Sequence, residues 1–278
     1  MSKLAYAMRA VVTGGGSGLG RGFCAQIAAR GGRVVVSDID EAGGSETVSI
    51  LKSRGAEAYF VKCDVARASE VEALAKRAEE LLGGVDLIVN NAGVATVGPV
   101  GEVPIDDWQW LMGINLFGVV YGCHAFVPRF KKQKHGHIIN VASAAGLLSA
   151  PNMGPYNVSK AGVVSLSETL FAELKNHDIG VTVLCPTFFK TNILKSSRDH
   201  AGGAKGARKI AEKAMEEAKL TVDDVARIAL DAADAGTLYV VPQADGRWAW
   251  RLKRLSPAAF QGGMNAVQKF LMKRAARG

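Results

Sequence analysis

Thr13-Gly14-Gly15-Gly16-Ser17-Gly18-Leu19-Gly20 stands between a short apolar run at residues 9–12 and a helix-like stretch at residues 23–29. Strand, glycine turn and helix in this order predict a dinucleotide site. The glycines let backbone amides approach a pyrophosphate, and the N-terminus of the following helix adds N–H donors and partial positive charge. A flexible turn is the alternative, since the chain has 32 glycines among 278 residues. The position directly after a strand favours the dinucleotide site.

Asp38 ends the next apolar run, residues 33–37, about twenty residues beyond the glycine loop. An acid at this place suits the two ribose hydroxyls of NAD and repels the 2′-phosphate of NADP. No basic residue stands in 13–20, and Ile39 follows Asp38. The sequence therefore predicts NAD rather than NADP as the cofactor. A simple turn former before Asp40 is the alternative role of Asp38.

Apolar and helix-like segments alternate along the chain. Such alternation predicts a single α/β domain of Rossmann type, a doubly wound parallel sheet of seven strands with helices on both faces. The expected strands are 9–13, 33–38, 58–62, 85–90, 136–141, 180–185 and 238–241. The expected helices are 18–30, 41–54, 68–82, 106–132, 154–176 and 221–234.

Tyr156 and Lys160 are four residues apart in an expected helix, so their side chains share one face. A free tyrosine keeps its proton until about pH 10, and an adjacent cation lowers that pKa by favouring the phenolate. Ser143, thirteen residues before Tyr156, can bind a substrate oxygen beside the phenol. The three residues predict a proton-transfer site for alcohol and carbonyl chemistry. Taken alone, such a pair is more often a half-buried ring and a solvated amine.

Together these motifs resemble the short-chain dehydrogenase/reductase family over roughly residues 9–241. The family's glycine motif matches 13–20, and its Asn-Asn-Ala-Gly segment matches 90–93. Its adenine-contacting acid matches Asp64, and its active-site asparagine matches Asn115. The resemblance implies these cofactor-binding residues: Gly14, Ser17, Gly18, Leu19, Gly20, Asp38, Asp64, Val65, Asn91, Ala92, Gly93, Tyr156, Lys160, Phe189 and Thr191.

The resemblance also implies an NAD-dependent oxidoreductase acting on a CH–OH group, with four catalytic residues. Tyr156 would be the general acid or base, and Lys160 would lower its pKa and hydrogen-bond the nicotinamide ribose. Ser143 would hold and polarise the substrate oxygen. Asn115 would anchor a water that links Lys160 to solvent. A non-catalytic dinucleotide-binding protein of the same fold is the rival, and the presence of all four residues speaks against it.

The family's usual Pro-Gly after the sixth strand is Pro186-Thr187 here. A threonine in place of the glycine would stiffen the hinge of the following lid, about 188–222. Within that lid we expect a helix at 207–219, and Thr191 still fits the family's hydroxyl that contacts the nicotinamide carboxamide. Apolar residues beside the catalytic motifs predict an apolar secondary alcohol or ketone as substrate. The expected pocket walls are Leu147, Leu148, Met153, Phe188, Phe189, Ile193 and Leu194, with structural packing as the alternative, above all for Leu148 and Ile193.

Cysteine and histidine patterns predict no metal site. Cys24, Cys63, Cys123 and Cys185 are scattered singly, which is typical of buried free thiols. The closest histidines, His135 and His137, lie in a loop before a strand. Neither a signal segment nor an uninterrupted apolar span is recognisable, so a cytoplasmic location is expected.

Residues 247–278 form a basic tail after a catalytic domain at 1–246. The tail holds eight of the 34 basic residues and no acid, so 1–246 has 26 of each sign. Phe260, Met264, Val267 and Leu271 follow helical spacing. Such a basic amphipathic extension packs against another subunit or against its own domain, or it lies on an anionic membrane. The membrane would suit a lipid, steroid or retinoid-like substrate. No nucleic-acid motif accompanies the charge, and the resemblance implies a homodimer or homotetramer.

Overall fold

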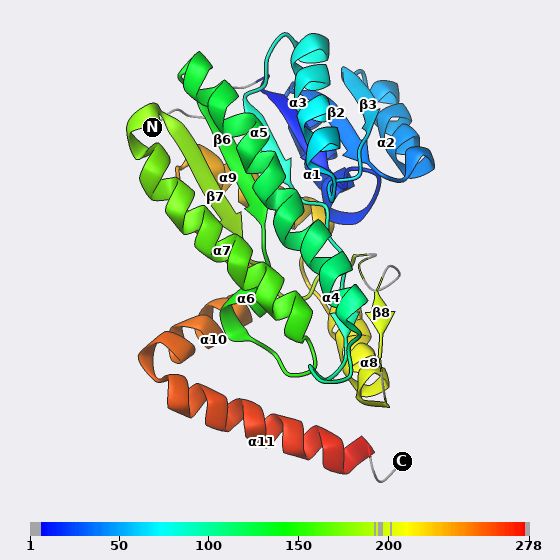
Figure 1. The fold of residues 1–278 in the computed structure, drawn as a ribbon, viewed down its shortest axis with the longest axis vertical. Helices are drawn as coiled ribbons and strands as arrows, with labels where there is room; N and C mark the ends of the chain where they lie inside the picture. The colour runs from blue at the N-terminus through cyan, green and yellow to red at the C-terminus, as the bar shows by residue number, and fades with distance from the viewer. Residues whose placement is uncertain (1–6, 192, 194–196, 201, 276–278) are drawn as a thin grey trace.

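Seven parallel strands form the centre of the computed structural model, which describes residues 7–191, 193, 197–200 and 202–275. The strand order is β3-β2-β1-β4-β6-β7-β9 (Figure 1). The central residues of the strands are mostly apolar and buried, because helices cover both faces of the sheet. The strands are β1 (Arg9–Thr13), β2 (Arg33–Asp38), β3 (Ala58–Lys62), β4 (Leu87–Asn90), β6 (Gly136–Val141), β7 (Ile179–Leu184) and β9 (Tyr239–Val240).

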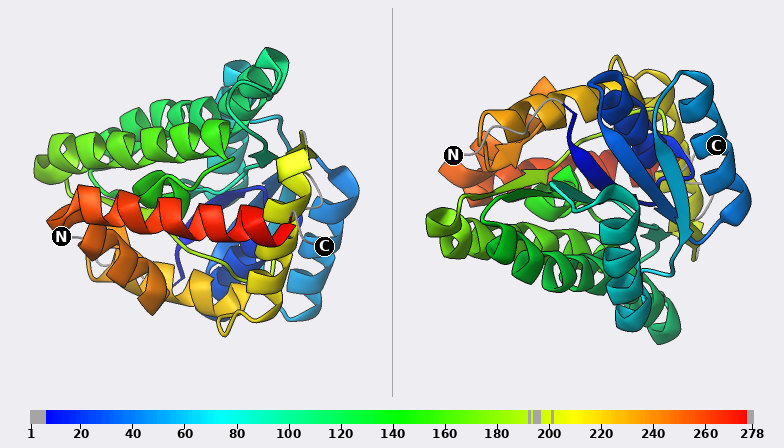
Figure 2. Two further views of the ribbon diagram at one scale, coloured as in Figure 1. Left: turned by 90° about the horizontal axis from the view of Figure 1, so that it is seen from below. Right: turned by 90° about the horizontal axis from the view of Figure 1, so that it is seen from above.

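Side chains alternate between two cores, one on each face of the sheet. Val11 and Val35 face a core shared with α3 (Ala68–Leu82), α5 (Gly118–Gln133) and α7 (Gly154–Leu174). Their neighbours Val12 and Val36 face the other core, shared with α1 (Gly18–Ala29), α2 (Glu41–Ser53) and α9 (Val222–Asp234). Figure 2 shows these two helix layers on either side of the sheet. The predicted α/β architecture is confirmed.

The direction of the winding reverses between β1 and β4, which lie side by side although two other strands separate them in sequence. Loops that follow such neighbouring strands diverge and leave a crevice at the carboxyl ends of the strands. The glycine loop follows β1, and Asn91 follows β4. The fold therefore brings both segments to the place where a dinucleotide binds in sheets of this kind.

The long helix expected at 106–132 is continuous but not uniform. It consists of α4 (Ile105–Met112), a π-helical turn η1 (Gly113–Phe117) and α5. Several short elements have no counterpart among the predicted ones: α6 (Ala144–Leu148), the 3₁₀ turn η2 (Lys175–His177), and the two-residue strands β5 (Thr96–Val97) and β8 (Arg198–Asp199). The lid helix α8 spans Gly202–Glu216, so it begins and ends earlier than the expected 207–219.

Two helices end the chain, α10 (Ala244–Leu255) and α11 (Pro257–Ala275). Pro257 lacks a backbone N–H and starts the second helix, so the chain turns at Ser256. The expected tail boundary after residue 246 falls inside α10. In Figures 1 and 2, α11 extends below the carboxyl end of the sheet. Val267 and Leu271 lie outside the residues whose side chains the structure describes.

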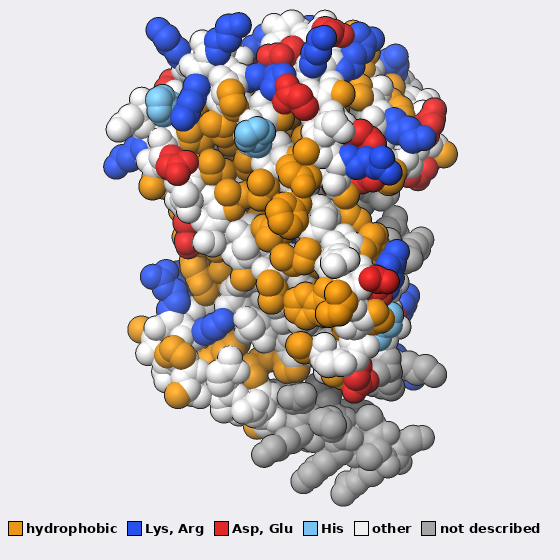
Figure 3. All heavy atoms as spheres, viewed as in Figure 1, with side chains coloured by type: hydrophobic (Ala, Val, Ile, Leu, Met, Phe, Trp, Pro, Cys, Tyr) orange, Lys and Arg blue, Asp and Glu red, His pale blue; other side chains and the backbone are white. Residues whose placement is uncertain are grey.

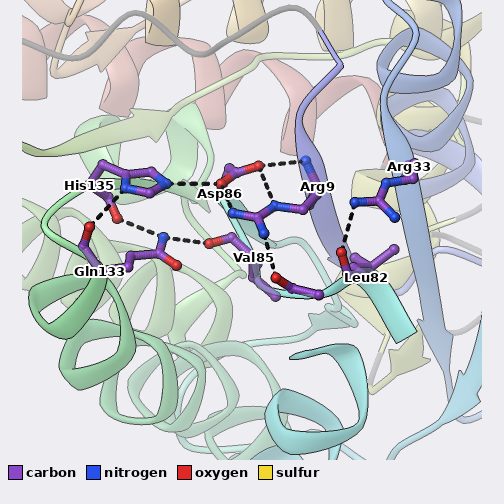
Figure 4. A network of polar contacts seen from close by, with 8 residues as sticks. Arg9, Arg33, Leu82, Val85, Asp86, Gln133 and His135 are labelled. Atoms are coloured by element: carbon purple, nitrogen blue, oxygen red, sulfur yellow. Dashed lines mark hydrogen bonds and ion pairs between the residues drawn. The ribbon is translucent and has the colours of Figure 1, made fainter. Parts of the chain in front are cut away.

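The amino end of the sheet is closed by a network of charged groups (Figure 4). The Arg9 guanidinium donates to both carboxylate oxygens of Asp86, at 2.9 and 2.6 Å, and to Gly83 O at 2.6 Å. The His135 ring contacts the same carboxylate at 3.1 Å. His137 is instead buried against Thr182, 2.9 Å away, so the two histidines do not meet. Among the described residues no group of three His, Cys, Asp or Glu side chains could hold a metal.

Candidate active site

The glycine loop folds back tightly on itself and on the residues after β4. Gly14 has a φ of +64°, and a Cβ there would lie 2.8 Å from Ala92 Cα. A Cβ on Gly20 would lie 2.0 Å from Gly14 O. The Asn91 side-chain amide donates to Thr13 O at 2.8 Å and to Gly14 O at 3.2 Å. Glycine is therefore required at positions 14 and 20, as the dinucleotide motif predicts.

The N-terminus of α1 differs from those of its neighbours because no side chain caps it. Ser17 is the N-cap residue, but its hydroxyl accepts no hydrogen bond from the first turn. Asp40 caps α2, and Thr221 caps α9 through a reciprocal bond with Asp224. The backbone N–H groups at Gly18, Leu19 and Gly20 are thus the ones in this layer that no cap satisfies. This donor set fits the pyrophosphate of a dinucleotide.

Asp38 lies against the glycine loop at the end of β2. Its Oδ2 accepts from Gly16 N at 2.8 Å, and its Oδ1 accepts from Asp40 N at 2.9 Å. Arg21 reaches the same loop and donates to Gly16 O at 2.6 Å, with Glu46 paired to it at 2.5 Å. Arg21 stands one residue beyond the glycine motif at 13–20, so the motif alone does not reveal this cation. Glu46 offsets its charge, so the acid at Asp38 remains the uncompensated one.

Asp64 and Val65 follow β3 at the same edge of the sheet. The Asp64 carboxylate accepts from Ala66 N at 3.0 Å and pairs with Arg67 at 3.3 Å. Val65 is buried and packs in the core beneath. Asp64 is therefore placed at the carboxyl edge as expected, with its side chain tied into the local turn.

Tyr156 and Lys160 are buried one turn apart in α7. The Lys160 ammonium lies 5.8 Å from the centre of the Tyr156 ring and donates to Val141 O at 2.8 Å. The Ser143 hydroxyl lies close enough to the Tyr156 phenol to lower the pKa of that phenol. Ser143 also starts α6, where its Oγ accepts from Ala145 N at 3.1 Å. The end of β6 therefore supplies partners for both α7 side chains.

The pKa of Tyr156 lies above its ordinary value, opposite to the direction expected from a neighbouring cation. Burial of the phenol raises this pKa, and the Ser143 hydroxyl only partly offsets it. Lys160 is itself desolvated, and burial lowers the pKa of its ammonium to about 8. The ammonium points at the Val141 carbonyl rather than at the phenol oxygen. Lys160 is thus a weak source of positive charge for Tyr156 in this arrangement.

Asn115 sits in the middle of the π-helical turn, where the helix widens by one residue per turn. Its side chain is fully buried and pairs with the backbone of Val94, accepting from N at 2.8 Å and donating to O at 2.9 Å. A Cβ on Gly93 would lie 3.3 Å from Asn115 Oδ1 and 3.6 Å from Lys160 Nζ. Asn115, Gly93 and Lys160 therefore meet at one place.

An apolar cluster surrounds the Tyr156 ring. Of the predicted pocket walls, Met153 and Ile193 belong to it. Leu147 and Leu148 pack into one core of the sheet, Phe189 packs into the other, and Phe188 is exposed. Leu194 lies outside the described residues. The cluster also contains residues that no sequence motif marks: Val94, Ala95, Trp110, Leu111 and Ala145.

The start of the lid is clamped to α4. Strand β8 pairs in parallel with β5, and the buried Asp107 carboxylate contacts the side chains of Arg198 and His200. The Arg198 guanidinium also stacks 3.8 Å from the centre of the Trp110 ring. These contacts hold the chain after Thr191, which is half-buried, beside the apolar cluster.

Helix α10 supports the loops on both sides of the site. Thr187 N donates to Gln243 Oε1 at 3.0 Å, and the Thr187 methyl would lie 2.6 Å from a Cβ on Gly246. At the other end of the helix, Lys253 Nζ donates to Leu147 O at 2.7 Å. The threonine that replaces the expected glycine thus packs against α10 and is bonded to it.

Comparison with known proteins agrees with this geometry. The family model for short chain dehydrogenase matches residues 8–202. A CLA biosynthesis dehydrogenase/reductase of Lactiplantibacillus plantarum is 37% identical over 185 residues, which cover 66% of this chain and 65% of that protein. The probable oxidoreductase EphD of Mycobacterium tuberculosis is 39% identical over 193 residues, which cover 69% of this chain and 33% of EphD. The chain thus matches less than two thirds of each relative's length.

Among solved structures, a short chain dehydrogenase/reductase from Burkholderia phymatum in complex with NAD superposes with a TM-score of 0.87. It is 36% identical, and the match covers 91% of this chain and 95% of the other. The similarity therefore extends across nearly the whole fold and includes an NAD-bound member.

Proposed function

The chain belongs to the short-chain dehydrogenase family, and we propose that it transfers a hydride between NAD and an apolar secondary alcohol or ketone. The observation that carries this proposal is the buried Tyr156 phenol. It lies inside an apolar cluster, with Ser143 near enough to lower its pKa, at the edge of the sheet that carries the glycine loop. A nicotinamide cofactor supplies the hydride chemistry when bound. The chain supplies position, proton and charge.

The protein's own groups have distinct roles in this proposal. The uncapped N–H groups of α1 bind the pyrophosphate, and Asp38 takes the adenosine ribose hydroxyls. Ser143 and Tyr156 hold the substrate oxygen between them. Tyr156 gives that oxygen a proton in ketone reduction and removes one in alcohol oxidation. Lys160 lies 5.8 Å from the centre of the Tyr156 ring and is held by Val141 O, and Asn115 is held by the backbone of Val94.

Substitution of Tyr156 by phenylalanine tests the assignment of the acid–base group. Wild type is screened for NAD reduction with hydrophobic secondary alcohols, and for NADH oxidation with the matching ketones. For any active pair, Tyr156→Phe should lower kcat/KM by about 10²–10⁴-fold and keep NADH affinity by cofactor fluorescence. Dinucleotide binding with no turnover on any substrate would favour the non-catalytic rival. A fully active phenylalanine variant would remove Tyr156 from the chemistry.

The proposed preference for NAD over NADP rests on Asp38. Its carboxylate accepts from Gly16 N of the glycine loop, and an acid after the second strand would repel a 2′-phosphate. Asp38→Asn keeps an oxygen for Gly16 N and removes the charge. We expect the ratio of NADP to NAD affinity to rise by about tenfold or more. Titration of both cofactors against wild type and variant measures it. Tighter binding of NADP than of NAD to wild type would contradict the assignment.

An apolar band on the face formed by α4, α5 and α7 supports a homodimer or homotetramer (Figure 3). Phe117 and Val158 are exposed there, and the Phe117 ring lies 6.0 Å from that of Tyr121. The helix from Ile105 to Gln133 is long and apolar enough to cross a membrane by composition alone. Its fully buried Phe126 and Phe130 instead belong to the core of the sheet. We propose that its remaining apolar side contacts another subunit.

Light scattering of wild type and of Phe117→Asp tests this surface. The substituted protein should have a lower mass than wild type and an unchanged circular dichroism spectrum. Ile39→Asp is a matched control, because Ile39 is a similarly exposed apolar residue that follows β2 and belongs to none of α4, α5 and α7. A monomeric wild type would overturn the proposal.

A further inference from the structure

Helix α10 has an inner side that packs on the domain and an outer side that is exposed. On the inner side, Gly246 is buried and the Trp250 ring lies 4.9 Å from that of Tyr239. The outer side carries three large apolar side chains: Trp248 is 68% exposed, Leu252 50% and Leu255 86%. Apolar side chains are visible over α10 at the lower left of Figure 3. Exposure of this kind on three neighbouring side chains needs a partner to cover them.

The three apolar residues follow one another at spacings of four and three, so they form a single strip along the helix. Arg251 and Arg254 are exposed beside this strip. The Arg251 guanidinium lies 5.5 Å from the Trp248 ring, and Arg254 lies 5.4 Å from the Trp250 ring. Arg251 therefore borders the apolar strip at its aromatic residue, and the exposed Arg254 lies toward the Trp250 side of the helix.

Charge decides between the partners that such a strip could meet. Residues 247–278 contain eight basic residues and no acid, whereas the remaining chain has equal numbers of both signs. Two copies of this segment would repel each other. A strip of three side chains is also small beside the roughly 800 Å² that each partner buries in a stable protein interface. An anionic surface that accepts a few apolar side chains fits both features.

We propose that the outer side of α10 docks on an anionic lipid bilayer. Trp248, Leu252 and Leu255 enter the boundary between headgroups and acyl chains, and Arg251 and Arg254 contact the lipid phosphates. Docking on this side leaves the inner contacts of α10 with Thr187 and Leu147 intact. The active site therefore stays assembled at the bilayer. The proposal does not depend on which substrate the enzyme uses.

Co-sedimentation of the full chain with lipid vesicles tests it. Vesicles of phosphatidylcholine with phosphatidylglycerol should carry wild type down, and pure phosphatidylcholine vesicles should do so at least about tenfold less. Trp248→Ser/Leu252→Ser/Leu255→Ser should weaken binding by about tenfold or more. Arg251→Gln/Arg254→Gln should weaken it by about thirtyfold at low salt. Val100→Ser/Ile105→Ser, which changes two exposed apolar residues elsewhere, should bind as wild type does.

Thermal melting and dinucleotide binding show whether each variant is folded. If the triple variant does not fold, vesicle binding is measured with Leu255→Ser and with Arg251→Gln/Arg254→Gln instead. These substitutions change only exposed side chains. Equal sedimentation of wild type and folded strip variants would overturn the proposal. So would failure of wild type to bind phosphatidylglycerol vesicles. A change in mass by light scattering on substitution of the strip, without vesicle binding, would instead assign it to a second copy of the chain.

Discussion

Each end of the sheet holds a charged side chain, the partly buried Asp86 at the amino end and the buried Lys160 at the carboxyl end, and the two differ in their partners. At the amino end, the Arg9 guanidinium and backbone N–H donate three hydrogen bonds to Asp86, and the His135 ring contacts the same carboxylate (Figure 4). At the carboxyl end, Lys160 is buried, and its recorded hydrogen bond goes to the neutral carbonyl of Val141. Within the described part of the chain, no Asp or Glu shifts its pKa; burial lowers that pKa, and the Cys185 thiol raises it. Asp86 is therefore paired with a cation, whereas the buried Lys160 is not paired with a carboxylate.

The pKa shifts express this difference. Burial raises the pKa of Asp86, but its bonds to Arg9 and His135 outweigh burial and hold that pKa below its ordinary value. Burial alone lowers the pKa of Lys160 to about 8. The charged form is favoured in the first case and disfavoured in the second. The paired Asp86 thus stabilises the folded protein. The buried Lys160 destabilises it, and in return a titratable group lies beside Tyr156.

Of the substitutions considered, Lys160→Met, at the carboxyl end of the sheet, should have the largest effect on activity. Activity should fall by about 10²–10⁴-fold in kcat/KM, because the phenol loses the group beneath it. The variant should nevertheless be about 1–3 kcal/mol more stable at pH 7, since an unpaired buried ammonium is gone. Steady-state kinetics and urea unfolding measure the two quantities. Loss of both activity and stability would mean that Lys160 is a structural residue.

The difference in stability between wild type and Lys160→Met should depend on pH. An unfolded lysine titrates near ~10.4, whereas the folded Lys160 has a pKa of about 8. Between these values the unfolded chain binds more protons, so wild-type stability rises with pH in this window. The cost of the buried ammonium is fully present below about pH 8. The advantage of the methionine variant should therefore shrink as pH rises from 8 to about 10.

Asp86→Asn is the counterpart at the amino end. It should lower the free energy of unfolding by about 1–3 kcal/mol at pH 7, because Arg9 loses its ionic partner. Since the folded pKa of Asp86 is depressed, its contribution is present above about pH 4 and is lost in acid. The difference in urea unfolding between wild type and variant should thus shrink as the pH falls below the ordinary pKa of the carboxyl group. Turnover at pH 7 should be unchanged, and a large loss of activity would refute the separation of the two ends.

Asp107→Asn tests an ionic cluster that lies at the carboxyl end. The carboxylate contacts Arg198 and His200, and its hydrogen bonds to them hold its pKa below the ordinary value. Without the charge, the start of the lid should be less firmly held, and KM for the substrate should rise about three- to tenfold with little change in kcat. An unchanged KM would show that the clamp does not shape the substrate site.

His135→Ala should have the smallest effect. The ring is half-exposed and contacts one oxygen of Asp86, which keeps both bonds to Arg9. We expect less than about 1 kcal/mol of lost stability and no change in turnover. Thermal melting of wild type, His135→Ala and Asp86→Asn measures the loss of stability in each variant. A loss as large as that of Asp86→Asn would make His135, not Arg9, the main partner.

Local patterns in the sequence were enough to predict the strands and the motif residues. Runs such as Val34 to Val36 are buried on both faces, and the glycine motif lies where the strand order requires it. The π-helical turn at Asn115 was not predictable, because hydrophobic spacing does not record one extra residue in a helix. Strands β5 and β8 hold two residues each and exist through their mutual pairing. No local pattern marks them.

The direction of side chains limited the prediction of the site. Leu147 and Leu148 adjoin Ser143 in sequence but turn into the core, whereas Trp110 comes from a distant helix and reaches the Tyr156 cluster. The pKa of Tyr156 was expected to fall because Lys160 is four residues away. Its rise depends on burial and on the Val141 carbonyl toward which the ammonium points, and both belong to the tertiary structure.

Helix α10 has a consequence for any attempt to shorten this protein. Gln243 and Lys253 are ten residues apart, and each holds a different loop beside the site, one at Thr187 and the other at Leu147. A truncation that ends the chain at Pro242 would remove both supports together. Such a deletion would therefore remove the exposed strip and distort the substrate pocket at the same time. Point substitutions on the outer side of the helix change the strip alone.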